Sequence, residues 1–191
     1  MMEALASPNR LIVAVTGLPG SGKSVVARIV AEELGLEVKV MGDVVREETV
    51  RRGLEPTPEN VERVARMLRE ELGRAAVAKL LAERLEPGRS YVLDGLRSVE
   101  EAEVLARAGW RVFIIGVYAP RKQRLERLMR RRRSGETLWE VLELRDASNI
   151  ELGVGEALAL SDYLIVNTGS LEDLEFEARR AARVAICGGD P

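Results

Sequence analysis

Eight residues near the start of the chain combine glycines, a lysine and a serine at a spacing suited to phosphate chemistry. They fit the pattern G-x-x-x-x-G-K-[ST], follow the β-branched apolar stretch 11–15, and precede residues 25–34, which carry apolar residues at helical spacing. Glycines let backbone N–H groups turn inward around an anion, beside the positive end of a helix. We therefore predict a nucleoside triphosphate site. Its residues are Gly17, Leu18, Pro19, Gly20, Ser21, Gly22, Lys23 and Ser24.

Two kinds of side chain around this phosphate loop are suited to the triphosphate and its metal ion. In such a loop the lysine, Lys23, reaches the β- and γ-phosphates, and the hydroxyl of Ser24 binds Mg²⁺. Asp94 ends an apolar stretch that begins at Tyr91, which is the place of a carboxylate that holds Mg²⁺ through water. A solvated turn aspartate is the alternative for Asp94. Arg97 follows at the same edge.

A second polar pair follows the next predicted strand along the chain. Asp43 and Arg46 come directly after residues 36–41, in the first turn of an amphipathic segment. Asp43 is also suited to a plain N-cap, and Arg46 to a solvated surface position. An enzyme that holds two phosphorylated substrates needs a second anion site, and arginine is its usual donor. Both interpretations stay open at this point.

The densest charge cluster lies between residues 121 and 133, with an inner face formed by leucines. One interpretation is a solvated basic helix, and another is a lid that closes over the triphosphate and stabilises charge in the transition state. A third is an RNA-contacting stripe. The basic residues are Arg121, Lys122, Arg124, Arg127, Arg130, Arg131, Arg132 and Arg133.

Two further residues extend this triphosphate site. Arg145 lies beyond a predicted break at Ser134-Gly135 and is a second candidate lid arginine. Asn167 follows the last predicted strand, in the loop Asn167–Ser170, where the chain can pack on a nucleotide base. The signal of this loop is weak without the fold.

The elements that must position these residues alternate between strand and helix. We predict strands at residues 11–15, 36–41, 91–93, 112–117 and 163–166, mostly apolar throughout, with helices between them. Such strands indicate a parallel sheet with helices on both faces, in which ligands lie beyond the carboxyl ends of the strands. The length of 191 residues suits one domain, residues 1–191, with small mobile insertions.

The composition excludes several classes of chemistry. The chain has no histidine and one cysteine, so imidazole catalysis, an internal disulfide and a cysteine metal cluster are excluded. The net charge of −2 gives no global electrostatic case for nucleic acid. No run approaches a membrane span and no secretory signal begins the chain, so we expect a cytoplasmic protein. Scarce amide residues and abundant charge suggest a thermophilic source.

With these pieces in order, the sequence resembles the nucleoside monophosphate kinase group, and most closely an archaeal family of nucleotide kinases related to adenylate kinase and dephospho-CoA kinase. The resemblance rests on residues 17–24, 41–48, 93–97 and 162–170. It implies the P-loop NTPase fold, with three layers, strand order 2-3-1-4-5 and a mobile lid at about 121–155. It also implies an acceptor-binding insertion at about 43–85.

The resemblance assigns roles to the candidate residues. Asp43, Arg46 and Arg97 would bind the acceptor, and Asn167 would lie beside the adenine. Lid arginines would include Arg127, one or more of Arg130 to Arg133, and Arg145. The sequence departs from adenylate kinases in continuing Lys23-Ser24-Val25, where they usually have Gly-Thr after the lysine, and in lacking the proline before Arg97.

Two functions from different classes follow from this. The first is Mg²⁺- and ATP-dependent phosphoryl transfer to a nucleotide or a nucleotide-like small molecule, with Lys23 neutralising charge and Asp43 as the best candidate for a base. The alternative is an NTP-hydrolysing switch or assembly factor that binds RNA or a protein partner, with residues 121–133 as its contact surface. The sequence leaves open the identity of the acceptor, the choice between ATP and GTP, and the oligomeric state.

Overall fold

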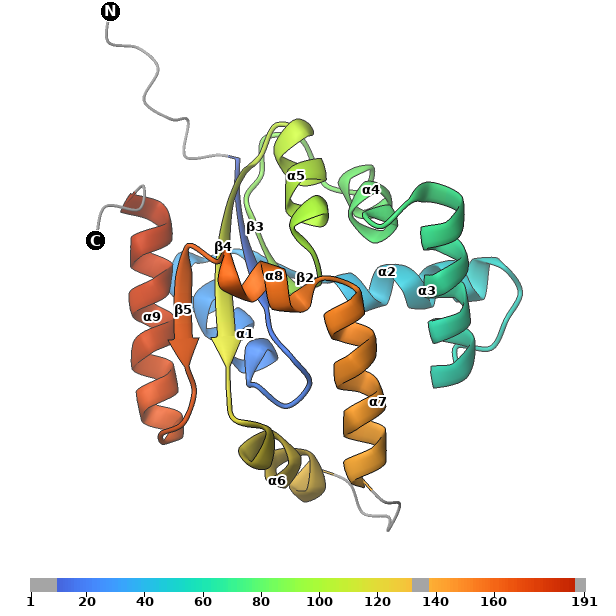
Figure 1. Ribbon diagram of the computed structural model, residues 1–191. Helices are drawn as coiled ribbons and strands as arrows, with labels where there is room; N and C mark the ends of the chain where they lie inside the picture. Colours follow the sequence, from blue (N-terminus) through green and yellow to red (C-terminus); the bar gives the residue numbers. More distant parts are fainter. Residues whose placement is uncertain (1–9, 132–137, 188–191) are drawn as a thin grey trace, which may run out of the picture.

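A computed structural model describes residues 10–131 and 138–187, and its strands form a single parallel sheet. The strands are β1 (Leu11–Thr16), β2 (Glu37–Val40), β3 (Tyr91–Leu96), β4 (Arg111–Tyr118) and β5 (Tyr163–Val166). Their order across the sheet is β2-β3-β1-β4-β5, and every neighbouring pair is parallel (Figure 1). The predicted fold class and strand order are confirmed.

The central strand β1 shows why the sheet needs cover on both faces. All six of its residues are buried. Because side chains alternate along a strand, Ile12 and Ala14 enter one hydrophobic core while Val13 and Val15 enter the other. A strand that is apolar at every position is stable only between two layers of helices.

Helices supply this cover on both sides (Figure 1). The core that contains Val13 is closed by α1 (Lys23–Leu34) and α9 (Leu171–Cys187). The opposite face carries α2 (Met41–Arg51), α3 (Pro58–Leu72), α4 (Ala76–Ala82), α5 (Val99–Arg107) and α8 (Val154–Ala159). Of these, α2 and α3 project from the side of the sheet in Figure 1 and, with α4, make up the predicted acceptor region.

The predicted lid begins directly after β4. It contains α6 (Arg121–Arg131) and α7 (Leu138–Glu151), which pack against each other and continue into α8. The predicted break at Ser134-Gly135 lies outside the described residues, as do Arg132 and Arg133.

Most predicted boundaries hold, and the differences have local causes. The side chain of Thr57 caps α3, accepting a hydrogen bond from the N–H of Asn60 at 3.3 Å, with Pro58 at the first helical position. β2 is shorter than predicted because α2 already begins at Met41, whereas β3 continues through Asp94 to Leu96. α8 was not predicted, since six residues are too few to show a helical period.

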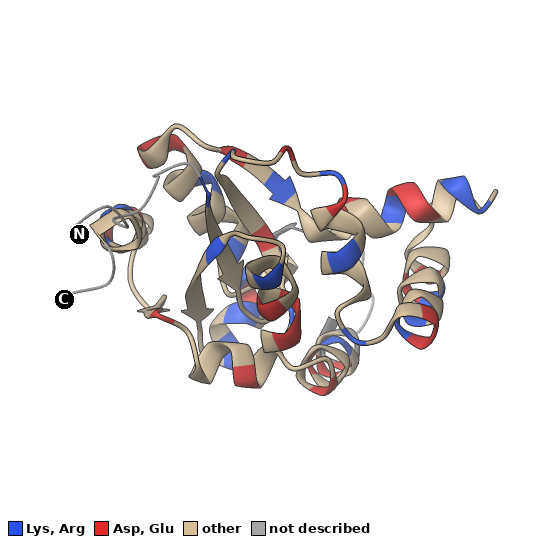
Figure 2. Cartoon of the chain, turned by 90° about the horizontal axis from the view of Figure 1, so that it is seen from above, with Lys and Arg blue, Asp and Glu red and all other residues tan. Residues whose placement is uncertain are grey.

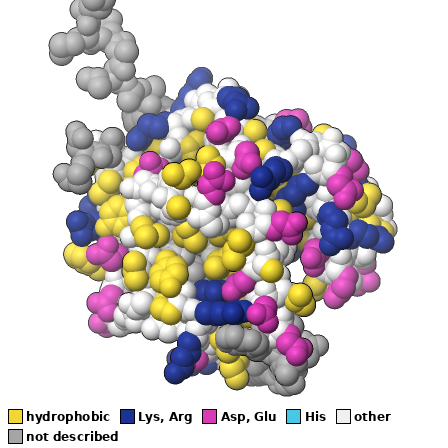
Figure 3. Space-filling model, in the orientation of Figure 1, with side chains coloured by type: hydrophobic (Ala, Val, Ile, Leu, Met, Phe, Trp, Pro, Cys, Tyr) yellow, Lys and Arg dark blue, Asp and Glu magenta, His cyan; other side chains and the backbone are white. Residues whose placement is uncertain are grey.

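Seen from above, the described part of the chain shows no region where charges of one sign alone gather (Figure 2). Lys and Arg alternate with Asp and Glu over the helices in Figure 2. Apolar side chains gather in Figure 3 over β4, β5 and α8, where Leu164 and Val166 are more than half exposed. Within the described ranges, no helix combines the length and the apolar character that crossing a membrane requires.

An ion-pair cluster joins the two helices on one face of the sheet. The carboxylate of Glu33 on α1 accepts hydrogen bonds from Arg179 at 2.7 Å and Arg183 at 3.0 Å, both on α9. These two bonds hold the pKa of Glu33 below its usual value, while its partial burial opposes them.

We predict that Glu33→Gln lowers the unfolding temperature at neutral pH by about 1–3 °C, because the cluster is exposed and screened. A depressed pKa in the folded state gives stability above the unfolded pKa, and this stability is lost as the pH falls through the folded pKa. The difference between wild type and variant in scanning calorimetry should therefore vanish in acid. An equal difference at pH 7 and pH 3 would contradict this account.

Candidate active site

The predicted phosphate loop connects β1 to α1. Gly22 is the N-cap of α1 with a φ of 105°, and a Cβ at this position would lie 2.5 Å from Nδ2 of Asn167. Backbone strain and collision therefore both require glycine here. Lys23 and Ser24 are the first two residues of α1, at the positive end of the helix dipole. The loop therefore lies between a strand and the start of a helix, which is the arrangement predicted from the sequence for triphosphate binding.

The polar atoms beside the loop fit a magnesium ion with its water ligands. Asp94 lies in β3 in register with Val15 of β1 and is 8 % exposed. Its Oδ1 is buried without a hydrogen-bond partner in the described part of the chain, and so are Thr16 Oγ1 and Ser21 Oγ. A native protein rarely leaves three buried oxygens unsatisfied near one loop. A set of oxygen ligands that includes one carboxylate suits Mg²⁺. Ser24, the second residue of the adjacent helix α1, would add its hydroxyl to this set.

Asp43 and Arg46 lie on α2, close to this edge of the sheet. Val40, the N-cap of α2, is in register with Asp94, so α2 starts beside the carboxyl end of β3. Asp43 is the third residue of the helix, which means that it is not the N-cap. Its carboxylate is ion-paired with Arg46, and both side chains are exposed. The structure therefore pairs two of the three predicted acceptor residues, Asp43 and Arg46, on one helix.

Arg97 belongs to a charged group that sequence reasoning did not find. Its backbone N–H donates to Glu101 at 2.8 Å, and Glu101 is only 1 % exposed. Burial raises the pKa of Glu101, while the N–H of Arg97 and the charges of Arg69 and Arg97 oppose that shift. Ser98 and Glu101 also have the spacing of a capping box, in which the N–H of Glu101 donates to the Ser98 hydroxyl at 3.3 Å.

Arg69 of α3 is the other new member of this group. It is half-buried, and burial, followed by the nearby charge of Arg97, lowers its pKa. Among the described residues, its guanidinium donates a hydrogen bond to the carbonyl of Ala65, at 2.9 Å. Within the described residues, neither Arg69 nor Arg97 forms an ion pair. No local signal separates Arg69 from the other arginines of α3.

The basic helix α6 lies against the outside of the phosphate loop. Arg127 donates to the carbonyl of Ser21 at 3.4 Å and to the backbone carbonyl of Asn167 at 3.0 Å. Asn167 is 6 % exposed and donates from Nδ2 to the same Ser21 carbonyl at 2.7 Å. The structure thus brings Arg127 and Asn167 together at the loop, although they are 40 residues apart.

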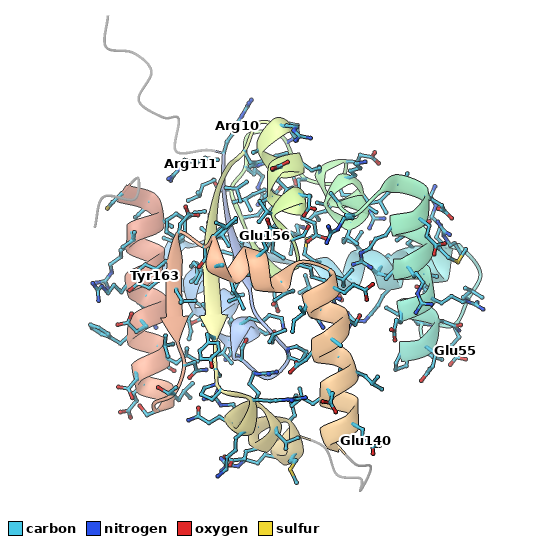
Figure 4. The ribbon with its side chains drawn as sticks, in the orientation of Figure 1. Arg10, Glu55, Arg111, Glu140, Glu156 and Tyr163 are labelled. Carbon is cyan, nitrogen blue, oxygen red and sulfur yellow. The ribbon has the colours of Figure 1, made fainter. Side chains whose placement is uncertain are left out.

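Arg124, one turn earlier on α6, forms a buried ion pair that the sequence analysis did not predict. Its two terminal nitrogens lie 2.8 and 2.6 Å from the carboxylate oxygens of Asp146 on α7. Side chains of α6 and α7 fill the space between these helices in Figure 4, where Glu140 marks the end of α7 nearest α6. Arg121 pairs with Glu143 across the same helices at 3.2 Å, but nearer the surface.

Arg145 does not join the residues around the loop. It follows Glu143 and precedes Asp146 on α7, yet its side chain is exposed and makes no ion pair in the described part of the chain. The structure therefore separates the two predicted lid arginines. Arg127 already contacts the loop, whereas Arg145 lies on the surface.

Comparison with known proteins identifies the family. Residues 16–144 match the family model described as an AAA domain. A UPF0200 protein of Hyperthermus butylicus is 47 % identical over 179 residues, which are 92 % of this chain and 95 % of that one. The chain belongs to the UPF0200 family. A second UPF0200 protein, of Thermococcus kodakarensis, is 42 % identical over 177 residues, covering 89 % of this chain and 95 % of its own.

Solved structures resemble this UPF0200 protein in fold. A gluconokinase from Sinorhizobium meliloti has a TM-score of 0.59 at 17 % identity, covering 93 % of this chain and 94 % of its own. TT1252 from Thermus thermophilus has a TM-score of 0.58 at 24 % identity, covering 96 % of this chain and all of its own. At these identities the likeness is one of fold. The likeness therefore supports the P-loop NTPase fold.

We predict that Asp94→Asn raises the Mg²⁺ concentration needed for half-maximal stabilisation by ADP about tenfold, because an amide carries no charge for the hydrated cation. Thermal unfolding at a series of Mg²⁺ concentrations measures this. Asp173→Asn is the matched control, because it makes the same change from carboxylate to amide at the start of α9. There the carboxylate of Asp173 accepts hydrogen bonds from Ser170. An unchanged Mg²⁺ dependence in Asp94→Asn would exclude this carboxylate from the metal site.

Proposed function

We propose that this UPF0200 protein is a Mg²⁺- and ATP-dependent kinase that phosphorylates a nucleotide or a nucleotide-like small molecule. One observation carries the proposal. At the carboxyl edge of the sheet, a phosphate loop lies close to a second group of cations, Arg97 and Arg69, which form no ion pair among the described residues and whose charge the buried Glu101 offsets only in part. Two anion sites at one edge suit an enzyme that transfers a phosphoryl group from one anionic substrate to another.

The donor side of the proposal uses the loop and its neighbours. Backbone N–H groups and Lys23 would hold the β- and γ-phosphates of ATP. Ser24 and Asp94 would hold Mg²⁺, which neutralises charge on the transferring phosphoryl group when it is bound. Asn167, in the loop that follows β5, lies beside Gly22 at the start of α1. The base of a nucleotide that extends beyond the phosphate loop at this point would therefore contact that loop.

The acceptor side is argued from uncompensated charge. A half-buried guanidinium without a carboxylate is unfavourable, and two of them repel each other, as the lowered pKa of Arg69 reflects. Glu101 offsets part of this charge, but its carboxylate is buried and accepts from the N–H of Arg97. A phosphate or another anion of the acceptor would complete the neutralisation. Arg46 would add a further donor from α2.

The transfer step follows from these positions. The bond between the γ-phosphorus and its bridging oxygen to the β-phosphate breaks, while an acceptor oxygen bonds to the γ-phosphorus. Lys23 would stabilise the developing charge, and Arg127 and Arg145 would do so if residues 121–155 close as a lid. Asp43 is the candidate base for a hydroxyl acceptor, although its ion pair with Arg46 would first have to open.

The similar proteins limit the choice of phosphate acceptor only in part. The gluconokinase neighbour shares the fold, so a sugar acid is an acceptor that must be tested beside nucleotides. The relation to adenylate kinase and dephospho-CoA kinase comes from sequence motifs and is part of this proposal. We place the reaction in the cytoplasm, where ATP is supplied. The thermophilic source suggested by the composition accords with relatives from Hyperthermus and Thermococcus.

The alternative of an RNA-binding switch is less favoured by the contacts of α6. Arg124 and Arg127 face the phosphate loop, and Arg121 is paired with Glu143. Arg121, Arg124 and Arg127 therefore have partners within the protein, whereas Lys122 and Arg130 are exposed. RNA binding requires a continuous stripe of solvated cations, and these contacts disfavour such a stripe.

A survey of acceptors with labelled ATP tests the proposal. Nucleoside monophosphates, dephospho-CoA and gluconate are incubated with the enzyme, Mg²⁺ and [γ-³²P]ATP, and products are separated by chromatography. We expect a labelled nucleotide-type product, and we expect Lys23→Ala to reduce its rate by several orders of magnitude. Label released only as inorganic phosphate would contradict phosphoryl transfer and favour the hydrolytic switch.

On the acceptor found in this survey, we predict that Arg97→Gln and Arg69→Gln each raise the KM of the acceptor about tenfold or more, while the KM of ATP changes less than about twofold. Each variant removes a charged donor to the acceptor and leaves the phosphate loop unchanged. Steady-state kinetics in both substrates measures this. Arg66→Gln, an exposed arginine one turn earlier on α3, is the matched control. Equal effects in all three variants would refute the acceptor site.

A further inference from the structure

The first half of the phosphate loop is a tight turn whose conformation depends on one peptide group. The N–H of Ser21 donates to the carbonyl of Leu18 at 3.1 Å, with Pro19 and Gly20 between them. The φ of 80° at Gly20 identifies a type II turn. Types I and II differ mainly in the orientation of the middle peptide group, which here joins Pro19 to Gly20. Rotating that group would reverse the direction of the Gly20 N–H.

Arg124 holds this middle peptide group from outside the loop. Its guanidinium donates to the Pro19 carbonyl at 3.0 Å and to the Ala119 carbonyl at 3.2 Å. The carboxylate of Asp146 holds the same guanidinium at 2.8 and 2.6 Å. Arg124 is 4 % exposed and Asp146 is 7 % exposed, so water competes little with these bonds.

The peptide group that joins Ser21 to Gly22 is held in the same way. The carbonyl of Ser21 accepts from Asn167 at 2.7 Å and from Arg127 at 3.4 Å. In a trans peptide the carbonyl and the following N–H point in opposite directions, and no cis peptide occurs in the described residues. Fixing the carbonyls of Pro19 and Ser21 outward therefore points the N–H groups of Gly20 and Gly22 into the loop. Among the described residues, neither N–H donates a hydrogen bond.

We propose that Arg124 and Asp146 are positioning residues that hold the phosphate loop in its polyphosphate-binding conformation before the ligand arrives. The inference rests on the proposed function in one respect, namely that the loop binds phosphate. Asp146 fixes the plane of the guanidinium, and Arg124 fixes the Pro19–Gly20 peptide. The N–H of Gly20 then faces the anion without a rotation that would weaken binding.

The geometry favours this role over simple attachment of α7 to α6. Arg121 and Glu143 already join the two helices near the surface. Arg124 adds a contact to the loop itself, 105 residues away in the sequence. It uses the planar fork of a guanidinium, with two N–H groups on the carboxylate and others on carbonyls, which a lysine cannot reproduce.

Pyrophosphate with Mg²⁺ is the probe for the test, because it binds the loop without involving an acceptor or turnover. Calorimetric titration compares the wild type with Arg124→Lys and Asp146→Asn at 25 °C, and Glu143→Gln is the matched control for the α6–α7 contact. We expect both variants to bind pyrophosphate about tenfold or more weakly, and the control to bind as the wild type does. In NMR spectra of the ligand-free protein, the Gly20 amide should shift in both variants and not in the control.

The outcomes separate this inference from the proposed function. A wild type that does not bind pyrophosphate contradicts the proposed function. A wild type that binds it, with Arg124→Lys and Asp146→Asn binding equally well, overturns the positioning role. Unfolding temperatures are recorded for every variant, since a merely structural pair would lower them without changing affinity or the Gly20 signal. If Arg124→Lys does not fold, the near-isosteric Asp146→Asn decides. If neither folds, the pair serves the fold and the proposal is wrong.

Discussion

The phosphate loop can bind an anion only while its N–H groups converge, and a glycine-rich segment has little intrinsic preference for that conformation. The rest of the structure supplies the constraint. β1 and α1 fix the two ends of the loop, while Arg124, Arg127 and Asn167 hold its carbonyls from outside. These three residues follow β4 and β5 in the chain, so the order β1-β4-β5 in the sheet brings them to the loop.

The arginines of this protein divide according to whether a partner compensates their charge. A charge withdrawn from water needs a counter-charge or a ligand, because its lost hydration must be replaced. Asp146 compensates Arg124, the most deeply buried of them, and Glu33 compensates Arg179 and Arg183 at the surface. Arg69 lacks such a partner among the described residues although it is half-buried. Compensated arginines hold other groups of the protein in place, and we propose that Arg69 is available to a substrate.

The sequence by itself determined the features that depend on local order. The spacing of Gly17, Gly22 and Lys23 located the phosphate loop, and the apolar strands identified a parallel α/β sheet, because both patterns are properties of short segments. The place of Asp94 near the carboxyl end of β3, which continues to Leu96, followed from the same pattern, since parallel strands end at one edge. The strand order came from the resemblance to nucleotide kinases.

The tertiary structure alone decided which charged side chains act together. The arginines of α6 are equivalent in the sequence, yet Arg124 is buried against Asp146, Arg127 contacts the loop and Arg130 is exposed. Likewise nothing local marked Arg69, or the buried Glu101, as a neighbour of Arg97. Helical periodicity reports only which face of a helix turns inward. Which group that face meets is set by chain segments up to 146 residues away, such as Asn167 against Ser21, and no local pattern encodes them.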